Sequence, residues 1–443
     1  MKSLLNRMRM YAPSFTWYEA CLWALLALAI IVRIMKLQLM EFKGDEFMFL
    51  MESFRDPFAL SQIHAVRSIV PIPHPPMFAY LLALPTSLTV SPIAVTAYIV
   101  GLNLLGLWLL HAFCRQVLSK EIALATTTLV ASMPWAIIFS RKIWNPDIVF
   151  PCEMLFLLAL AMLLRSYRPW KLYLFALALA IFLQAHLLSM FSIIPLAAVF
   201  WFAKPHIEKT HLKRAGLFLF VLHIPYLAYC LTTDAPTFVG ERMGSGLNIQ
   251  LFIDNVLWWL NTSTGLGFSY LLGESGYDAF LKTFSLAWAE VVFRMYVLLG
   301  VVAYFWCISK TIDSLKRSGA EALAPYKLMM LFLLVWSVFL LVFLSASNVS
   351  SPPHYWVSLM VIIPFCVVLF LHSIARHVLP VFRHVVHGIL LIVIATNIVF
   401  MLSFYSFLEN HHEKITGDYG TPYMFERDSW NERLESAAGD ELY

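Results

Sequence analysis

Apolar segments of about 20 residues recur along the whole chain, separated by short polar breaks. No soluble core could bury so much apolar surface, because 60% of the 443 residues are hydrophobic and only 13% are charged. Each segment has the length that an α-helix needs to cross a bilayer. We therefore expect an all-α polytopic membrane protein with about eleven transmembrane helices. The predicted spans lie near residues 18–38, 92–113, 122–139, 148–164, 172–186, 188–203, 216–232, 286–308, 328–346, 356–372 and 388–407.

The basic residues predict how these spans are oriented. They cluster in loops that all fall on the N-terminal side of the membrane when the spans are counted in order. Because cytoplasmic loops are enriched in Lys and Arg, we expect a cytoplasmic N-terminus and a periplasmic or extracellular C-terminus. The apolar stretch 77–90 is only about 14 residues long and contains Pro85, which favours an interfacial or re-entrant segment.

This topology predicts one membrane domain, residues 1–407, and a polar tail, residues 408–443, on the outer face. The longer loops all lie outside, and elaborated loops are where function concentrates. Within one of them, residues 248–261 carry apolar side chains at helical spacing and predict an interfacial helix. The expected outer loops are residues 39–91, 140–147, 232–285 and 347–355.

Several classes of protein are excluded by what the sequence lacks. The formal net charge is +4 and the basic residues are spread over short loops, so we expect no nucleic-acid partner. No histidine pair or CxxC spacing with metal-site geometry is present, so no metal or other cofactor is expected to be obligatory, although a divalent cation is compatible. Walker and GxGxxG phosphate loops are also missing, which argues against nucleotide-driven transport.

An acidic pair, Asp45 and Glu46, follows the first predicted span directly. Side chains adjacent in sequence point in different directions, so the two carboxylates are expected to do different jobs. One would act as a base and the other as a supporting group. The alternative is an ordinary solvated loop.

Further motifs accompany this pair on the outer side. HPPMFAYLLALP follows about 30 residues later, SRKIWNPD joins the third and fourth spans, and SSPPHYWVSLMVIIP places His-Tyr before a late span. In combination they resemble the dolichyl-phosphate-mannose protein mannosyltransferase and aminoarabinose transferase group of GT-C glycosyltransferases. The resemblance covers most of the chain as a topology, whereas each motif alone is short.

The resemblance implies a GT-C fold and an inverting glycosyltransferase, with a bacterial inner membrane as its location. The donor would be a polyprenyl-phosphate-linked sugar and the acceptor a hydroxyl of a glycan, lipid or protein. Asp45 would be the base. An alcohol is about 12 pKa units less acidic than an aspartic acid, so proton transfer must accompany attack on the sugar. The chain lacks the soluble domain of the large protein mannosyltransferases, which puts a protein acceptor in doubt.

The leaving phosphate requires cationic hydrogen-bond donors near the outer surface. The candidates that the motifs and outer loops supply are His74, Arg141, Lys142, Arg294, His354 and Tyr355. Arg294 follows Glu290 by one helical turn, so a self-contained ion pair is the alternative for it. Tyr355 either covers the donor or belongs to the aromatic belt of the membrane.

Three polar residues are expected on the sugar or acceptor side. Asp147 takes the place of the family's second acidic residue, and alternatively caps the following helix. Gln184 and His186 fall at a predicted outer turn, where polar groups are costly unless they face a cavity or water.

The polar tail either covers the acceptor site or is disordered. The runner-up function is a transporter or flippase of a lipid-linked saccharide, in which the same carboxylates bind or relay instead of catalysing. A non-catalytic scaffold would leave the acidic pair without a purpose.

Overall fold

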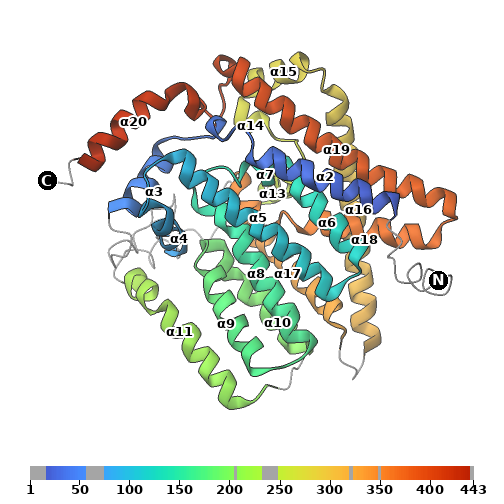
Figure 1. Cartoon of the computed structure of the whole chain (residues 1–443). Coiled ribbons are helices and arrows are strands. Elements are labelled where there is room, and N and C mark those ends of the chain that lie inside the picture. Colours follow the sequence, from blue (N-terminus) through green and yellow to red (C-terminus); the bar gives the residue numbers. More distant parts are fainter. Residues whose placement is uncertain are drawn as a thin grey trace, which may run out of the picture.

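The computed structural model describes residues 16–55, 74–203, 207–231, 248–318, 323–347 and 351–439. Within these ranges the chain is helical and contains no strand, as the sequence predicts (Figure 1). The predicted loop segments 56–73, 232–247 and 348–350 lie outside the described residues.

The helices follow one another with short connections. The first half contains α2 (Trp17–Ile34), η1 (Leu37–Leu39), α3 (Gly44–Arg55), α4 (Met77–Thr86), α5 (Pro92–Val117), α6 (Lys120–Ser132), α7 (Pro134–Ile138), η3 (Asn145–Ile148), α8 (Val149–Arg165), α9 (Pro169–Leu183), η4 (Leu187–Ser192), α10 (Ile193–Ala203) and α11 (Lys209–Leu231). The second half contains α13 (Ile249–Asn261), α14 (Ser269–Leu272), α15 (Glu274–Thr283), α16 (Ala287–Ser318), α17 (Pro325–Ala346), η5 (Pro353–Leu359), α18 (Ile362–His377), α19 (Pro380–Asn410), η6 (His412–Lys414) and α20 (Tyr423–Gly439).

Helix occupies every predicted span, and the chain is a multi-pass membrane protein. Of the described helices, six are long and apolar enough to cross a membrane, or seven if the bent pair of η5 and α18 forms one span. The predicted count of about eleven crossings is not confirmed. One reason is length: α9 has 15 residues, which extend about 22 Å, whereas the hydrocarbon core is about 30 Å thick. Another is the division of the third predicted span into α6 and α7.

The short helix α4 occupies the stretch that the sequence predicts to be interfacial or re-entrant. It has 10 residues, too few to cross a bilayer, and Pro85 lies inside it. The hydroxyl of Thr86 donates a hydrogen bond of 3.0 Å to the Ser53 carbonyl, which ties α4 to α3. The predicted helix in the long outer loop is present as α13, where the Asn248 side chain accepts from the amide of Leu251.

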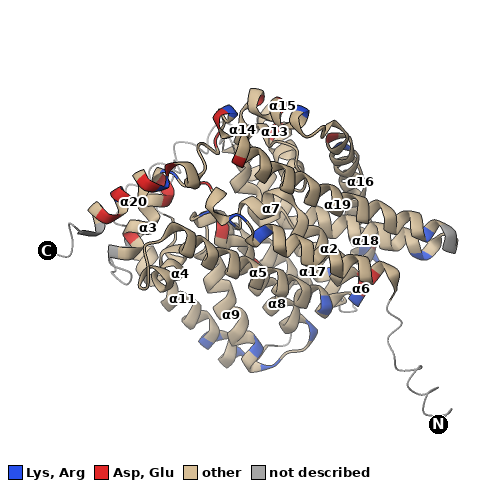
Figure 2. Cartoon of the chain, turned by 45° about the horizontal axis from the view of Figure 1, so that its top comes forward, with Lys and Arg blue, Asp and Glu red and all other residues tan. Residues whose placement is uncertain are grey.

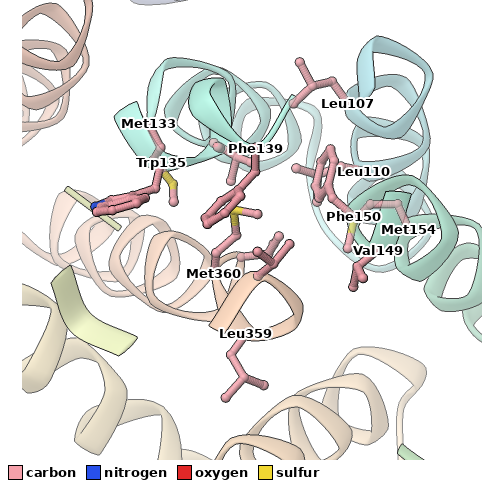
Figure 3. Close-up of a cluster of buried hydrophobic side chains, with 14 of the residues drawn as sticks. Leu107, Leu110, Met133, Trp135, Phe139, Val149, Phe150, Met154, Leu359 and Met360 are labelled. Atoms are coloured by element: carbon pink, nitrogen blue, oxygen red, sulfur yellow. The ribbon is translucent and has the colours of Figure 1, made fainter. Parts of the chain in front are cut away.

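The centre of the bundle is the contact between α5 and α8. Gly106 makes the close approach possible, because a Cβ at this position would lie 2.8 Å from the ring of Phe150. Figure 3 shows Leu110 of α5 and Phe150 of α8 side by side at this contact, with Phe139 after α7 beside Met360 after η5. This packing brings η3 and the start of α8 next to η5. Asp147 lies in η3, and His354 and Tyr355 lie in η5.

A buried arginine stabilises the break between α6 and α7. Pro134 has no backbone N–H, so carbonyls near the end of α6 are left without a helical partner. Arg33, only 1% exposed, donates to the carbonyls of Val130, Ala131 and Ala136 at 3.3, 3.1 and 2.7 Å. Its guanidinium group therefore provides hydrogen bonds to the backbone carbonyls at the break. Unpaired carbonyls would be costly within a membrane.

The described part of the C-terminal tail is folded, so the alternative of a disordered tail is wrong for these residues. Helix α20 lies along α3 at one edge of the bundle (Figure 1). The ring of Trp430 packs 5.2 Å from Phe42 and 5.7 Å from Phe47, and the amide of Tyr423 donates to the Met40 carbonyl. The tail thus covers the segment that carries the acidic pair.

Candidate active site

The predicted site residues gather where the start of α3 meets the loop between α7 and α8. Lys142 from this loop is 6% exposed and lies between two carboxylates. Its Nζ is 2.8 Å from Oε1 of Glu41 and 3.0 Å from Oε1 of Glu46, although the second contact lacks the alignment of a hydrogen bond. We call Glu41, Glu46, Lys142 and Asp147 the carboxylate cluster.

The electrostatics of the cluster keep Lys142 charged. Burial by itself lowers the pKa of Lys142, but Glu41 and Glu46 together raise this pKa above its ordinary value. Burial raises the pKa of Glu41, and the attraction of Lys142 opposes that rise. Lys43 also contacts the Glu41 carboxylate, so two lysines share it. A buried ammonium held by carboxylates is a fixed element of structure, because breaking it would strand a charge.

The two members of the acidic pair have different surroundings, as the sequence predicts. Glu46 is fully buried, and its Oε2 accepts a hydrogen bond of 2.8 Å from the backbone amide of Lys43. This bond caps the first turn of α3, where a negative charge is favourable. The side chain of Asp45 is exposed at the same helical turn. Glu46 is therefore locked in place, whereas Asp45 is accessible.

Asp147 has one oxygen engaged and one free. Oδ2 accepts from the Trp144 amide at 3.1 Å, which holds the turn of η3. The alternative that Asp147 caps the following helix is wrong, because the N-cap of α8 is Ile148, which has no side-chain cap. Oδ1 is buried without a hydrogen-bond partner. Buried carboxylate oxygens are normally satisfied, so this one is available to a ligand hydroxyl or water. Asn103 of α5 fixes the backbone by donating to the Asp147 carbonyl at 2.9 Å.

A row of rings connects the carboxylate cluster with the other predicted residues. The Lys142 ammonium lies 4.1 Å from the ring centre of Trp144, which packs 4.5 Å from His354. The row continues through ring pairs at 4.6, 6.4 and 5.5 Å, in the order His354, Tyr355, His186 and His74. We call these four residues with Trp144 the ring row. Motifs far apart in sequence therefore meet in one region.

The histidines of the ring row are neutral at physiological pH, which corrects the expectation that His74 supplies a positive charge. Burial lowers the pKa of His74 to about 4 and that of His186 to about 3. A neutral histidine still donates one hydrogen bond. Nδ1 of His186 accepts from the Leu188 amide at 3.2 Å, which leaves Nε2 as the protonated nitrogen.

Three predicted residues are used elsewhere. Arg141 donates to the carbonyls of Val32 and Lys36 at 3.3 and 2.6 Å, so it caps the end of α2 instead of presenting donors to the cluster. Gln184 donates its side-chain amide to α11. The Arg294 side chain is 71% exposed and lies 3.9 Å from Glu290, in agreement with the self-contained pair.

The structure adds residues that the sequence analysis missed. Glu41 is the clearest, because it contacts both lysines of the region. Its position at the end of the first span, two residues before Lys43, was the available signal. Asp418 of the tail lies 3.6 Å from Lys43 and was missed because nothing in the sequence ties the tail to the first span.

The described ranges contain no group of three or more His, Cys, Asp or Glu side chains that could hold a metal ion. This finding does not test whether the reaction requires a metal, so the absence of an obligatory metal remains a prediction. The carboxylate cluster already contains its own cation in Lys142.

Comparisons with known proteins identify the class of fold. Neither family models nor curated proteins match the sequence. Among solved structures, apo ArnT from Cupriavidus metallidurans is similar with a TM-score of 0.51 and 12% identity, over 86% of this chain and 75% of that one. ArnT bound to undecaprenyl phosphate gives 0.51 and 11%, over 94% and 85%. The archaeal oligosaccharyltransferase AglB from Archaeoglobus fulgidus reaches 0.49 at 13% identity, over 94% and 60%.

At such identities the likeness to ArnT establishes the fold alone. The chain has the all-helical GT-C fold that the sequence motifs predict. The subgroup within this fold remains a prediction.

Proposed function

We propose that this protein is an inverting glycosyltransferase, which moves a sugar from a polyprenyl-phosphate donor to an acceptor hydroxyl. The observation that carries the proposal is the difference in exposure between the two members of the acidic pair at the start of α3. Asp45 is exposed, whereas Glu46 beside it is buried against Lys142. A base must reach its acceptor, so Asp45 is the better candidate and Glu46 serves to position it.

The bonds and electrons of this transfer balance without an oxidant or a reductant. The acceptor oxygen forms a bond to the anomeric carbon while the bond from that carbon to the phosphate oxygen breaks. The phosphate leaves with the bonding electrons, and the acceptor proton passes to Asp45. Attack from the face opposite to the phosphate inverts the anomeric configuration.

The ring row is suited to the phosphate and the sugar. His186 is buried and His74 and His354 are half-buried, so their N–H groups are worth more as donors to an anion than they would be in water. Lys142 is paired with Glu41 and Glu46, so it holds this region together and offers no free positive charge to the phosphate. The free oxygen of Asp147 is placed to accept from a sugar hydroxyl. The solved ArnT complex contains undecaprenyl phosphate, a lipid of the class that we propose here as carrier.

We further propose that this site faces the periplasm or another outer compartment of a bacterial inner membrane. The basic loops at the other end of the spans support this orientation. The acceptor can be a glycan, a lipid or a protein, since each presents the same hydroxyl chemistry to one aspartate.

Transfer of a labelled sugar tests the proposal. Purified protein would be incubated with radiolabelled polyprenyl-phosphate sugars and a membrane extract, and the labelled product analysed for its anomeric configuration. We expect an inverted linkage and loss of about 100- to 10,000-fold in rate for Asp45→Asn. Asp278→Asn, an exposed acid on α15, is the matched control. Transport of the intact lipid-linked saccharide without cleavage would support the flippase alternative instead.

A further inference from the structure

An open cavity lies at the end of the bundle opposite to the proposed active site. It has a volume of about 660 Å³ and is bordered by the ends of α5, α6, α16, α17 and α18. Helix α18 extends between the two sites, because η5 with His354 precedes its first residue and His372 near its last turn lines this cavity. Along α18, the basic lining residue Arg376 lies about 21 Å from the first residue, Ile362.

The lining of this cavity is strongly basic. Lys310, Arg317, Lys327 and Arg376 face it, and Asp313 is the single acidic residue among the lining side chains. Within the described ranges, none of the four basic residues forms a salt bridge. Unpaired basic side chains around a concave surface concentrate anions.

Two further features point to a bound anion. Nε2 of His372 is buried in the lining without a hydrogen-bond partner, while its Nδ1 lies 4.0 Å from the Glu121 carboxylate. The N-terminus of α17 also reaches the cavity, and its N-cap residue Ala324 supplies no side-chain cap. The first turn of this 22-residue helix therefore presents its positive end uncapped.

The other walls of the cavity are apolar. Trp306, Met330, Phe365 and Leu369 line it, all on helices long or apolar enough to lie in the membrane. A soluble anion would gain nothing from these walls. An amphiphile with a phosphate group and an acyl chain matches both halves of the lining.

We propose that this cavity binds the headgroup of an anionic phospholipid. The phosphate lies among the four basic side chains and His372, and the first part of an acyl chain lies against Trp306 and Phe365. Basic loops alone would follow from the orientation of the spans. The cavity and the unpaired His372 nitrogen go beyond that rule. The proposal does not depend on the catalytic function of the other site.

Native mass spectrometry on the full chain, released from nanodiscs, tests this site. The nanodiscs would contain phosphatidylcholine with a rising fraction of phosphatidylglycerol, and the retained lipid would be identified. The test variant is Lys310→Gln with Arg376→Gln. The control is Lys213→Gln with Arg214→Gln, exposed on α11, which removes the same charge from the same membrane face. Size exclusion confirms that each variant is folded.

We expect wild-type protein to retain phosphatidylglycerol in preference to phosphatidylcholine. The test variant should bind it about 25-fold more weakly, at about five-fold for each basic side chain, and the control should match wild type. Equal retention of the two lipids by wild type would overturn the proposal, as would equal weakening in both variants. Competition by millimolar glycerol phosphate as effective as that by the lipid would identify a site for soluble anions and would also overturn it.

Discussion

Basic side chains are paired with carboxylates at one end of the helical bundle, and those that line the cavity at the other end are unpaired within the described residues. At the proposed active site, Lys142 is buried between two carboxylates and Lys43 supports one of them. At the other end, four basic side chains line an open cavity, and none of them forms a salt bridge with a described residue. Figure 2 shows acidic residues gathered over α3 and α20, with basic residues prominent at the far ends of α6, α9 and α18.

Lys142 and its carboxylates therefore stabilise the structure of a site, whereas the four basic side chains of the cavity are free to bind a ligand. A buried ion pair holds geometry, since its loss strands a charge, but it has little capacity left for a ligand. Unpaired basic side chains hold no geometry and retain that capacity. The comparison predicts that substitutions at one end affect stability and catalysis, and that those at the other end affect binding of lipid.

The largest effect on stability is expected for Lys142→Met. This change leaves Glu46 buried without its cation and Glu41 with only the half-exposed Lys43, and it should lower the free energy of unfolding by about 3–5 kcal/mol. Lys43→Met, at a side chain that is 36% exposed, should cost at most about 1 kcal/mol. Thermal unfolding in detergent compares the two. Equal losses would mean that the carboxylate cluster does not hold the site together.

Acid should weaken the ring row. The pKa of His74 is lowered to about 4 and that of His186 to about 3. Below about pH 6.5 the unfolded chain therefore binds protons at both histidines, whereas the folded chain binds them only at a lower pH. The stability is therefore full above about pH 6.5 and falls as the pH drops toward 4, by up to about 3 kcal/mol for each histidine. Thermal unfolding of wild type and His74→Asn across this range measures it. An identical acid dependence in the variant would contradict the assignment.

A smaller effect is expected at the opposite cavity. Lys310→Gln with Arg376→Gln should remove up to about 2 kcal/mol of stabilisation by phosphatidylglycerol, the equivalent of a 25-fold loss in affinity. Sugar transfer in phosphatidylcholine nanodiscs should change less than two-fold, because these two side chains lie at the end of the bundle opposite to the active site. A collapse of transfer in that neutral lipid would show that the two ends are not separate.

The smallest effect is expected for Arg294→Gln. Its ion pair with Glu290 is 3.9 Å long and largely exposed, so its loss should cost less than about 0.5 kcal/mol. The KM for the donor should stay unchanged, since the described contacts pair Arg294 with Glu290 and not with a residue of the ring row. A raised KM with unchanged stability would restore the phosphate-binding role that the sequence suggested.

The sequence predicts the fold well because the membrane allows few alternatives. A long apolar segment must form a helix to satisfy its backbone, which is why helix occupies every predicted span. The number of crossings is harder, because α9 and α10 are short and α6 ends at a proline. Length alone does not show whether such helices traverse the bilayer.

The site was predictable only in part. The outer motifs identified Lys142, Asp147 and the histidines, since polar groups beside apolar spans require a purpose. Adjacent residues were not distinguishable: Arg141 caps α2 whereas Lys142 meets Glu41. That choice depends on how the α7–α8 loop packs against the end of α2, which is tertiary information. The lowered pKa values of the histidines likewise arise from burial that the sequence does not reveal.

The central claim concerns which carboxylate of the acidic pair takes the acceptor proton. The most direct measurement is the single-turnover rate of sugar transfer in Asp45→Asn and in Glu46→Gln, with saturating donor and with folding verified for both. We predict that Asp45→Asn loses at least about 100-fold while Glu46→Gln retains turnover and loses mainly stability. A folded Asp45→Asn protein that transfers sugar at the wild-type rate would contradict the account.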